Sequence, residues 1–86
     1  MKTKSLGRSQ TEITLPGSKR RLLVSYETLV AIIYDIPYRR PIITKRYHSE
    51  TTERHIREWF AANDQDIELA LEWPQSILDE ILEGIE

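Results

Sequence analysis

Residues 11–34 read T-E-I-T-L-P-G-S-K-R-R-L-L-V-S-Y-E-T-L-V-A-I-I-Y, and this stretch decides the fold class. Residues 11–15 alternate between polar and apolar side chains, which is typical of a short, half-buried strand. Pro16-Gly17 supplies the residues that a type II turn needs at its two centres, so residues 20–26 are predicted to return as a hairpin partner. Residues 29–34 form a third run, rich in β-branched and aromatic residues.

The connections between these runs are less sharply specified. Glu27-Thr28 has no glycine for a two-residue hairpin turn, so a bulge or kinked continuation fits as well as a reversal. Residues 35–41 contain two prolines, which cannot donate ladder hydrogen bonds, and are predicted to form a loop before a strand at residues 42–47. Residues 66–73 alternate again and favour a short edge strand, although their Glu, Leu and Ala content also suits a helix.

The segment Y-H-S-E-T-T-E-R-H-I-R-E-W-F at residues 47–60 predicts the start of a helix. Ser49 or Thr51 can cap the free amide hydrogens at its first turn. On a helical wheel, one side carries Ile, Trp and Phe, and the other carries Glu and Arg residues spaced four apart, which stabilise an exposed helix face. A second helix is predicted after Pro74, which suits a first helical turn and precedes apolar residues at helical spacing.

These segments together predict one α+β domain at residues 11–86. We expect an antiparallel sheet of three to five strands, formed mainly by residues 11–47, with two helices at about 49–62 and 74–84 packed on one face. Residues 1–10 are polar and basic, and are predicted to be a flexible tail. The predicted core consists of Leu22, Val24, Val30, Ile32, Ile43, Ile56, Trp59, Phe60, Leu69, Leu71, Ile77, Leu78, Ile81 and Leu82.

Catalytic and metal-binding patterns are scarce in this sequence. It has no cysteine, which excludes a thiolate nucleophile and a cysteine zinc site. His48 and His55 are seven residues apart, which is about 10 Å along a helix and too far to ligate one ion together. A Ser or Thr nucleophile paired with His55 is conceivable, but no motif supplies an oxyanion hole. We therefore expect that the protein is not an enzyme and that it binds neither a cofactor nor a metal ion.

No apolar run approaches the roughly 20 residues that span a bilayer, since the longest is residues 29–33. The amino terminus also lacks the apolar segment of a signal peptide. We therefore expect a cytoplasmic protein without a membrane partner, present as a monomer or small homo-oligomer.

Charge is distributed unevenly along the chain. Residues 1–46 carry ten cationic and three acidic side chains, whereas residues 47–86 carry two cationic and eleven acidic ones. Such asymmetry indicates an electrostatic partner, of opposite kinds for the two halves, although mutual attraction between the halves or simple solubility explains it equally well.

The basic half predicts a nucleic-acid surface. Cations that meet phosphates, interleaved with tyrosine rings on which bases stack, are typical of sequence-tolerant binding. The same charges also suit an ordinary solvated sheet edge, and the whole-chain pI of about 5.7 is low for a dedicated nucleic-acid binder. The candidate residues are Arg20, Arg21, Tyr38, Arg39, Arg40, Lys45 and Arg46.

Two motifs resemble a family of short uncharacterised proteins of phages and other mobile elements. They are S-Y-E-T-L-V-A at residues 25–31 and S-E-T-T-E-R-H-I-R-E-W-F at residues 49–60. The family pattern has an S-Y-x-T-x-V-A strand and an S-x-T-T-x-x-H-I-x-x-W helix start, and Leu29 stands where that pattern has proline. The resemblance implies a small strand-then-helix fold and a mobile-element setting, and it brings no established activity.

Within these motifs, polar residues gather around one strand and one helix start. They either form a pocket that holds a ligand at the helix amino terminus or a hydrogen-bond network that fixes the helix on the sheet, and the network is favoured. The residues concerned are Tyr26, Thr28, Ser49, Thr51, Thr52 and His55.

The function expected from the sequence is a small non-enzymatic binding module that holds nucleic acid through its basic, tyrosine-bearing sheet edge and loop. The alternative is an accessory protein or inhibitor whose acidic carboxy-terminal half binds a host or phage protein.

Overall fold

Six strands and two α-helices make up the fold of the computed structural model, which describes residues 2–85. The elements are β1 (Lys2–Gly7), β2 (Gln10–Leu15), β3 (Arg20–Ser25), β4 (Thr28–Tyr34), β5 (Ile42–Thr44), α1 (Glu50–Ala62), the 3₁₀ helix η1 (Ile67–Leu69), β6 (Leu71–Trp73) and α2 (Gln75–Ile85). The predicted loop at 35–41, the helix at about 49–62 and the helix at about 74–84 are confirmed. At residues 66–73, the alternatives resolve into a 3₁₀ turn followed by a three-residue strand.

The strands form one mixed sheet in the order in which they occur in the chain, β1-β2-β3-β4-β5-β6. Neighbours from β1 to β5 are antiparallel, and β6 pairs with β5 in parallel. The prediction of a purely antiparallel sheet of three to five strands is therefore wrong. The parallel pair needs a crossover connection, which α1 supplies between β5 and β6.

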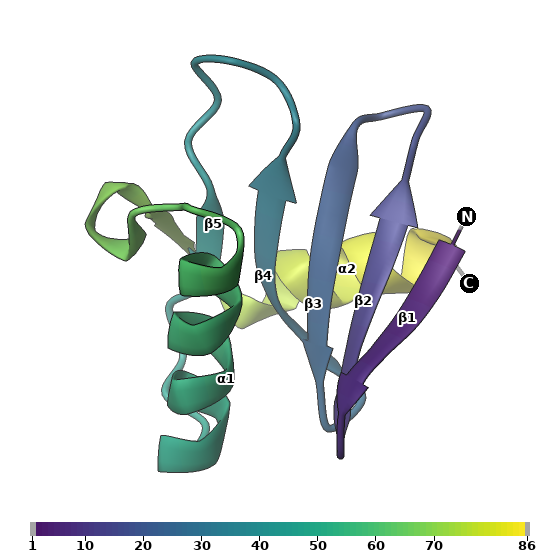
Figure 1. Ribbon diagram of the computed structural model, residues 1–86. Coiled ribbons are helices and arrows are strands. Elements are labelled where there is room, and N and C mark those ends of the chain that lie inside the picture. Colours follow the sequence, from purple (N-terminus) through teal and green to yellow (C-terminus); the bar gives the residue numbers. More distant parts are fainter. Residues whose placement is uncertain (1, 86) are drawn as a thin grey trace.

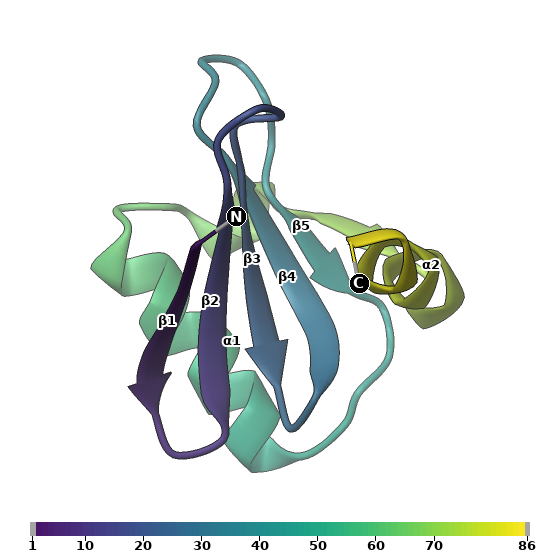
Figure 2. The same cartoon turned by 90° about the vertical axis from the view of Figure 1, so that its right-hand side faces the viewer.

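The two helices cover opposite faces of the sheet, as Figures 1 and 2 show. The prediction that both pack on one face is therefore wrong. Each helix has its own apolar cluster. On one face Ile56, Trp59 and Phe60 of α1 pack against β3 and β4, and on the other face Leu78 of α2 packs against a separate set of residues from β2 to β5. The reason lies in β3 and β4, whose successive side chains are fully buried on both faces, as in strands that lie in the middle of three layers.

The connection at Tyr26-Glu27 is a reversal, and a bulge follows it. Both residues have positive φ, 49° and 68°, which is the backbone of the tight type I′ hairpin turn. The β3–β4 register then shifts, because Leu23 is opposite Ala31 and Val24 is opposite Leu29, which leaves Val30 as the extra residue. Both expected alternatives therefore occur, one after the other.

The other hairpin turn differs from its prediction. Gly17 does not adopt the positive φ that the second centre of a type II turn requires; Lys19 has it instead, at 54°. The Lys19 amide donates to the Pro16 carbonyl oxygen at 3.3 Å, so the reversal spans four residues rather than two.

An edge strand occupies most of the segment that was predicted to be a flexible tail. Residues 2–7 form β1, which pairs with β2 from Lys2 opposite Thr14 to Gly7 opposite Gln10. Only Leu6 of this strand is partly buried, so its polar composition gave no apolar pattern to detect. Backbone pairing stabilises the strand, and residue 1 lies outside the described residues.

The core is centred on β3, β4 and α1. The prediction was wrong for Leu69, Leu71 and Ile77, which are exposed because η1 and β6 lie at a sheet edge and α2 turns Ile77 outward. Several residues of β2 to β5 that the sequence left out are buried: Ile13, Leu23, Leu29, Ala31, Ile33 and Ile42.

Candidate functional site

Two loops project together from one end of the sheet, as Figure 1 shows. One is residues 16–19, between β2 and β3, and the other is residues 35–40, between β4 and β5. Together with Arg20, the first residue of β3, we call them the loop end. The Asp35 amide donates to the Lys19 carbonyl oxygen at 2.8 Å and ties the loops at their base. The loop end carries four cations, which are Lys19, Arg20, Arg39 and Arg40.

The longer loop carries one exposed aromatic side chain, Tyr38, followed by two arginines. Tyr38 is fully exposed and has a φ of 71°, a left-handed backbone that a non-glycine residue rarely adopts. The guanidinium carbon of Arg39 lies 4.3 Å from the centre of the Tyr34 ring, a cation–π contact. Nε of Arg40 donates to the Leu69 carbonyl oxygen at 2.6 Å, which ties the loop to η1.

None of the four loop-end cations has an ion pair within 4.0 Å among residues 2–85, where the pairs involve Arg21 and Arg54. Asp35 is the only carboxylate of the loop end, and Arg21 binds it with both Nε and Nη2, the latter at 2.8 Å. The loop end therefore keeps a surplus of positive charge that no internal partner neutralises.

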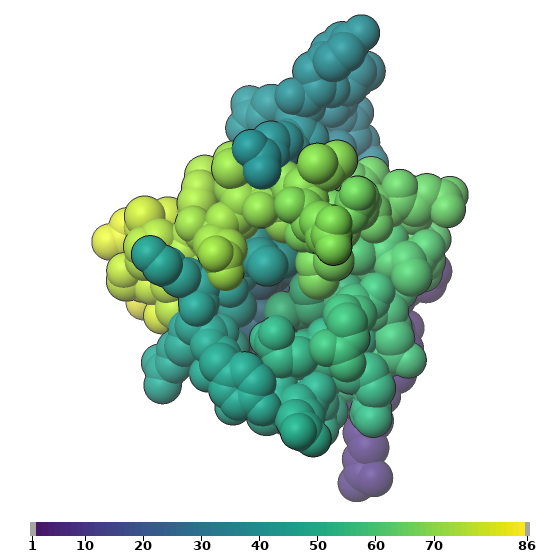
Figure 3. Space-filling view, turned by 90° about the vertical axis from the view of Figure 1, so that its left-hand side faces the viewer, coloured from purple at the N-terminus to yellow at the C-terminus, as the bar shows by residue number. Residues whose placement is uncertain are grey.

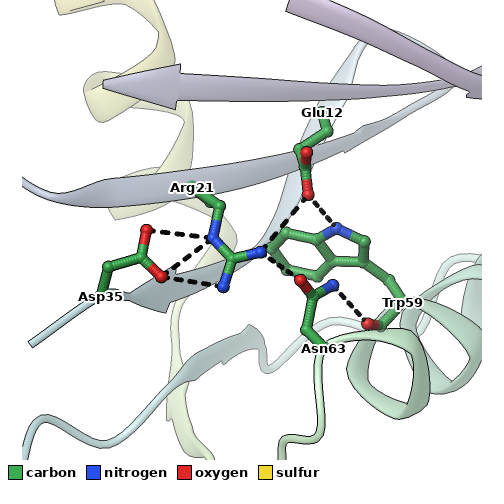
Figure 4. A network of polar contacts seen from close by, with 5 residues as sticks. All are labelled: Glu12, Arg21, Asp35, Trp59 and Asn63. Carbon is green, nitrogen blue, oxygen red and sulfur yellow. Dashed lines mark hydrogen bonds and ion pairs between the residues drawn. The ribbon is translucent and has the colours of Figure 1, made fainter. Parts of the chain in front are cut away.

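The sequence predicted that Arg21 is a surface cation that binds nucleic acid. In the structure it is instead the centre of the network in Figure 4. Besides Asp35 it contacts Asn63, the C-cap of α1, through a hydrogen bond and Glu12 through a 3.9 Å ion pair. Glu12 also accepts a hydrogen bond from the Trp59 indole at 2.8 Å. Arg21 therefore links β2, the base of the longer loop and the carboxyl end of α1, and we remove it from the candidate nucleic-acid surface.

Lys45 and Arg46 follow the far end of β5, so the structure does not bring them to the loop end. Figure 3 shows the light-green chain around η1 and β6 between the loop at the top and the teal chain after β5. This intervening chain is acidic, with carboxylates at Asp64, Asp66, Glu68 and Glu72. Of the seven predicted nucleic-acid residues, four thus share one surface: Arg20, Tyr38, Arg39 and Arg40.

The polar cluster lies at the opposite end of the sheet, where α1 begins beside the β3–β4 hairpin. Ser49 caps α1, because its Oγ accepts from the Thr52 amide at 3.1 Å. Oγ of Ser25 lies 3.0 Å from Nδ1 of His55 and 3.3 Å from Oγ1 of Thr52. Ser25, Thr52 and His55 are all at least 96% buried, and they link the first turns of the helix to the end of β3.

Tyr26 covers this cluster from the turn. Its ring stacks on His55 with 6.0 Å between centres and 25° between planes. Burial lowers the pKa of His55 below its ordinary value of 6.5, and the nearby Arg54 adds to that effect while Glu58 opposes it. The imidazole is therefore held neutral, and neither the Ser25 hydroxyl nor the imidazole can reach a substrate in this arrangement.

Two of the six predicted cluster residues do not join the network. Thr51 lines a surface groove on the outer side of α1, and Thr28 is partly buried opposite Ser25 without a side-chain hydrogen bond within residues 2–85. Sequence reasoning missed Ser25 as a site residue, although it begins the S-Y-E-T motif. Its inward direction depends on the strand register, which the motif does not specify.

A partly buried connection joins α2 to the sheet through Gln75. Its amide nitrogen donates to the Leu29 carbonyl oxygen and to Asp79, both at 2.9 Å, so its oxygen is left to accept from Thr44 at 2.6 Å and from His48 at 2.8 Å. Nε2 of His48 must therefore carry a proton. This contact explains His48 as a structural residue.

No group of three or more His, Asp or Glu side chains within residues 2–85 is arranged to hold a metal ion. No helix there is both long and apolar enough to cross a membrane.

Comparison with known proteins identifies a family. The model of a family described as "Family of unknown function (DUF8033)" matches residues 1–79. No curated protein and no solved structure matches the chain. The resemblance to a family of uncharacterised proteins is confirmed at that general level.

Proposed function

The chain belongs to DUF8033, a family of unknown function, and we propose that it binds single-stranded nucleic acid through the loop end. The observation that carries this proposal is the pairing of two loops at one end of the sheet. It brings four cations that have no ion pair among residues 2–85 to the end that also carries the exposed Tyr38. The surface is restricted to the loop end, because Arg21 is bound internally and an acidic segment separates Lys45 and Arg46 from it.

Charge supports phosphate binding at this surface. Nucleic-acid affinity depends mainly on cations that displace counterions from phosphates, so cations whose charge is already neutralised contribute little. Arg20 and Arg40 each use Nε in an internal hydrogen bond, to Ser18 and to the Leu69 carbonyl oxygen, which fixes the side chain while its terminal nitrogens remain for another acceptor.

The exposed ring of Tyr38 favours single-stranded nucleic acid over a duplex as the ligand. Aromatic side chains bind unpaired bases by stacking, at about 1–3 kcal/mol per base, and a base inside a duplex offers no free face. Tyr38 has its whole side chain in solvent, whereas the Tyr34 ring is already in contact with Arg39. Tyr38 is therefore the stacking residue of this proposal.

Fluorescence anisotropy with a short labelled oligonucleotide of mixed sequence, at several salt concentrations, tests the proposal. Arg39→Ala with Arg40→Ala should weaken binding and flatten the salt dependence by about 0.7 in log–log slope for each cation removed. Lys45→Ala with Arg46→Ala removes the same charge beyond β5 and should leave the binding of a short strand largely unchanged. Tyr38→Ala should weaken single-strand binding more than duplex binding.

Two results would contradict the proposal. One is wild-type binding no tighter than about 10⁻⁴ M at low salt, the weak end of non-specific affinities. The other is an equal loss of binding in the two double variants, which would mean that net charge rather than the loop end determines affinity.

The proposal includes the setting that the sequence suggested, a cytoplasmic protein of a phage or other mobile element. If oligonucleotide binding fails, the alternative is a protein partner for the acidic carboxy-terminal half. Urea unfolding followed by refolding of the same sample would first establish that the protein tested was folded.

A further inference from the structure

The outer edge of β1 is a regular strand edge without a partner strand among residues 2–85. β1 is the first strand of the sheet and pairs on one side with β2, in unbroken register from Lys2 to Ser5. Five of its six residues are exposed, and it contains no proline. Such an edge presents a row of backbone amide and carbonyl groups to which another extended chain can bind.

The charge of this edge is positive, and neither Lys2 nor Lys4 has an ion pair within 4.0 Å among residues 2–85. Lys2 and Lys4 are two residues apart and therefore point to the same face of the sheet, and Arg8 follows in the turn. Residues 2–11 contain no Asp or Glu. Glu12, opposite Lys4 in β2, already accepts from the Trp59 indole at 2.8 Å and lies 3.9 Å from Arg21.

A groove of about 490 Å³ lies beside the edge, on the face that α1 covers. Three apolar side chains line it, Leu6 of β1 and Trp59 and Ala62 of α1. The rest of its lining is polar or charged: Lys4, Gln10, Glu12, Arg21, Glu58 and Asn63. The groove offers apolar surface within reach of side chains from a strand that pairs with β1, since alternate side chains of such a strand point to this face.

We propose that the β1 edge binds an acidic, extended segment of a partner protein as a seventh strand of the sheet. Its backbone pairs with β1, carboxylates on its α1 side meet Lys2 and Lys4, and a neighbouring apolar side chain enters the groove. Main-chain hydrogen bonds supply affinity in this mode of recognition, and alternate side chains supply specificity.

Charge also argues against a second copy of this chain as the occupant. If β1 paired with β1 of another molecule, lysines of both strands would be brought to one edge, and like charges at facing positions destabilise a sheet. Lysines on an edge strand therefore discourage self-association, and they are complementary to an acidic strand.

A labelled peptide tests the proposal by anisotropy; it has glutamate at two alternate positions, valine at the next alternate position and threonine between them, so that all three side chains point to one face. The same peptide with lysine in place of glutamate is its counterpart. Lys2→Glu with Lys4→Glu should weaken glutamate-peptide binding about tenfold and strengthen lysine-peptide binding, since two facing charge pairs change from attraction to repulsion. The matched variant Lys45→Glu with Arg46→Glu has the same charge change away from β1 and should bind as the wild type does.

A third peptide separates strand pairing from simple attraction between charges. It has the sequence of the glutamate peptide with N-methyl groups on alternate residues, which block hydrogen bonds on one edge, and it should bind much more weakly than the unmodified peptide. Equal binding of the two peptides would overturn the proposal. So would wild-type dimers in sedimentation that Lys2→Glu with Lys4→Glu dissociates, because the occupant would then be another copy.

Discussion

At one end of the sheet Ser25, Thr52 and His55 are buried and hydrogen-bonded to one another, whereas at the other end Tyr38 and Arg39 are exposed on a projecting loop. Both sets of residues stood out in the sequence as polar or charged clusters with aromatic neighbours. In the first set, the polar groups satisfy one another inside the protein. In the second, the charged groups are left without ion pairs among residues 2–85.

This difference shows how to separate two kinds of polar cluster within one small domain. A polar side chain that is buried and paired is explained by folding, because an unpaired group there would cost free energy. A cation or ring that is exposed and unpaired contributes little to folding and is available to a ligand. The comparison therefore predicts that changes at the two ends have separable effects, on stability at one and on binding at the other.

The largest expected effect on stability lies on α1, the element that connects the two ends. Trp59→Ala should lower the free energy of unfolding by roughly 3–5 kcal/mol, since it removes a large core side chain together with the hydrogen bond to Glu12. Glu53→Ala, at a partly buried position of the same helix without an ion pair among residues 2–85, should cost well under 1 kcal/mol. Equal midpoints for both variants in urea would show that the buried face of α1 is wrongly assigned.

A smaller loss is expected inside the buried cluster. Ser25→Ala removes the hydroxyl that contacts both His55 and Thr52, and leaving buried polar groups without a partner should cost about 1–3 kcal/mol. Urea unfolding measures this cost, and oligonucleotide affinity measured on the same variant should match the wild type. A loss of affinity without a loss of stability would move the binding surface to this end.

The pH dependence of stability should reveal the neutral His55. Because burial lowers its pKa in the folded state below 6.5, the unfolded chain binds the proton more readily. The contribution of the neutral ring is therefore fully present above about pH 6.5 and is lost as the pH falls below that value. The stability difference between wild type and His55→Gln should shrink on acidification, and a difference that stays constant would contradict the argument.

The smallest effect on stability is expected at the loop end. Tyr38→Ala should change the free energy of unfolding by no more than about 0.5 kcal/mol, because the side chain is fully exposed. Thermal and urea unfolding would detect a larger change. A marked destabilisation would mean that the Tyr38 ring supports the loop. The loop end would then contribute to stability as well as to binding, and the two ends would differ less than their exposure indicates.

Sequence periodicity predicted the helices well, because α1 has a strict apolar side with Ile56, Trp59 and Phe60 and a recognisable cap at Ser49. It also predicted three of the central strands. It could not place the helices on opposite faces. That arrangement follows from Leu22 and Leu23, adjacent residues that are both fully buried, and an unbroken apolar run does not say which layers cover it.

The candidate sites were predictable in their composition but not in their geometry. Arg20 and Arg21 are neighbours in the sequence, yet alternation along β3 sends one toward Ser18 at the loop end and the other into the network with Asp35. Likewise β1 lacked any apolar pattern, since its pairing depends on backbone groups. Which cations face outward depends on register and turn geometry, and neither can be read from residue types.

The agreement between strand order and chain order also has a consequence for how the protein folds. From β1 to β5 each strand pairs with the one before it, so most of the sheet forms through contacts that are local in sequence and closes only short loops, which favours fast folding. The pairing of β6 with β5 is the exception, because it closes the long connection formed by residues 45–70, which includes α1. We therefore expect β6 to dock late, after α1 has packed on the sheet, and α2 to cover the second face after it.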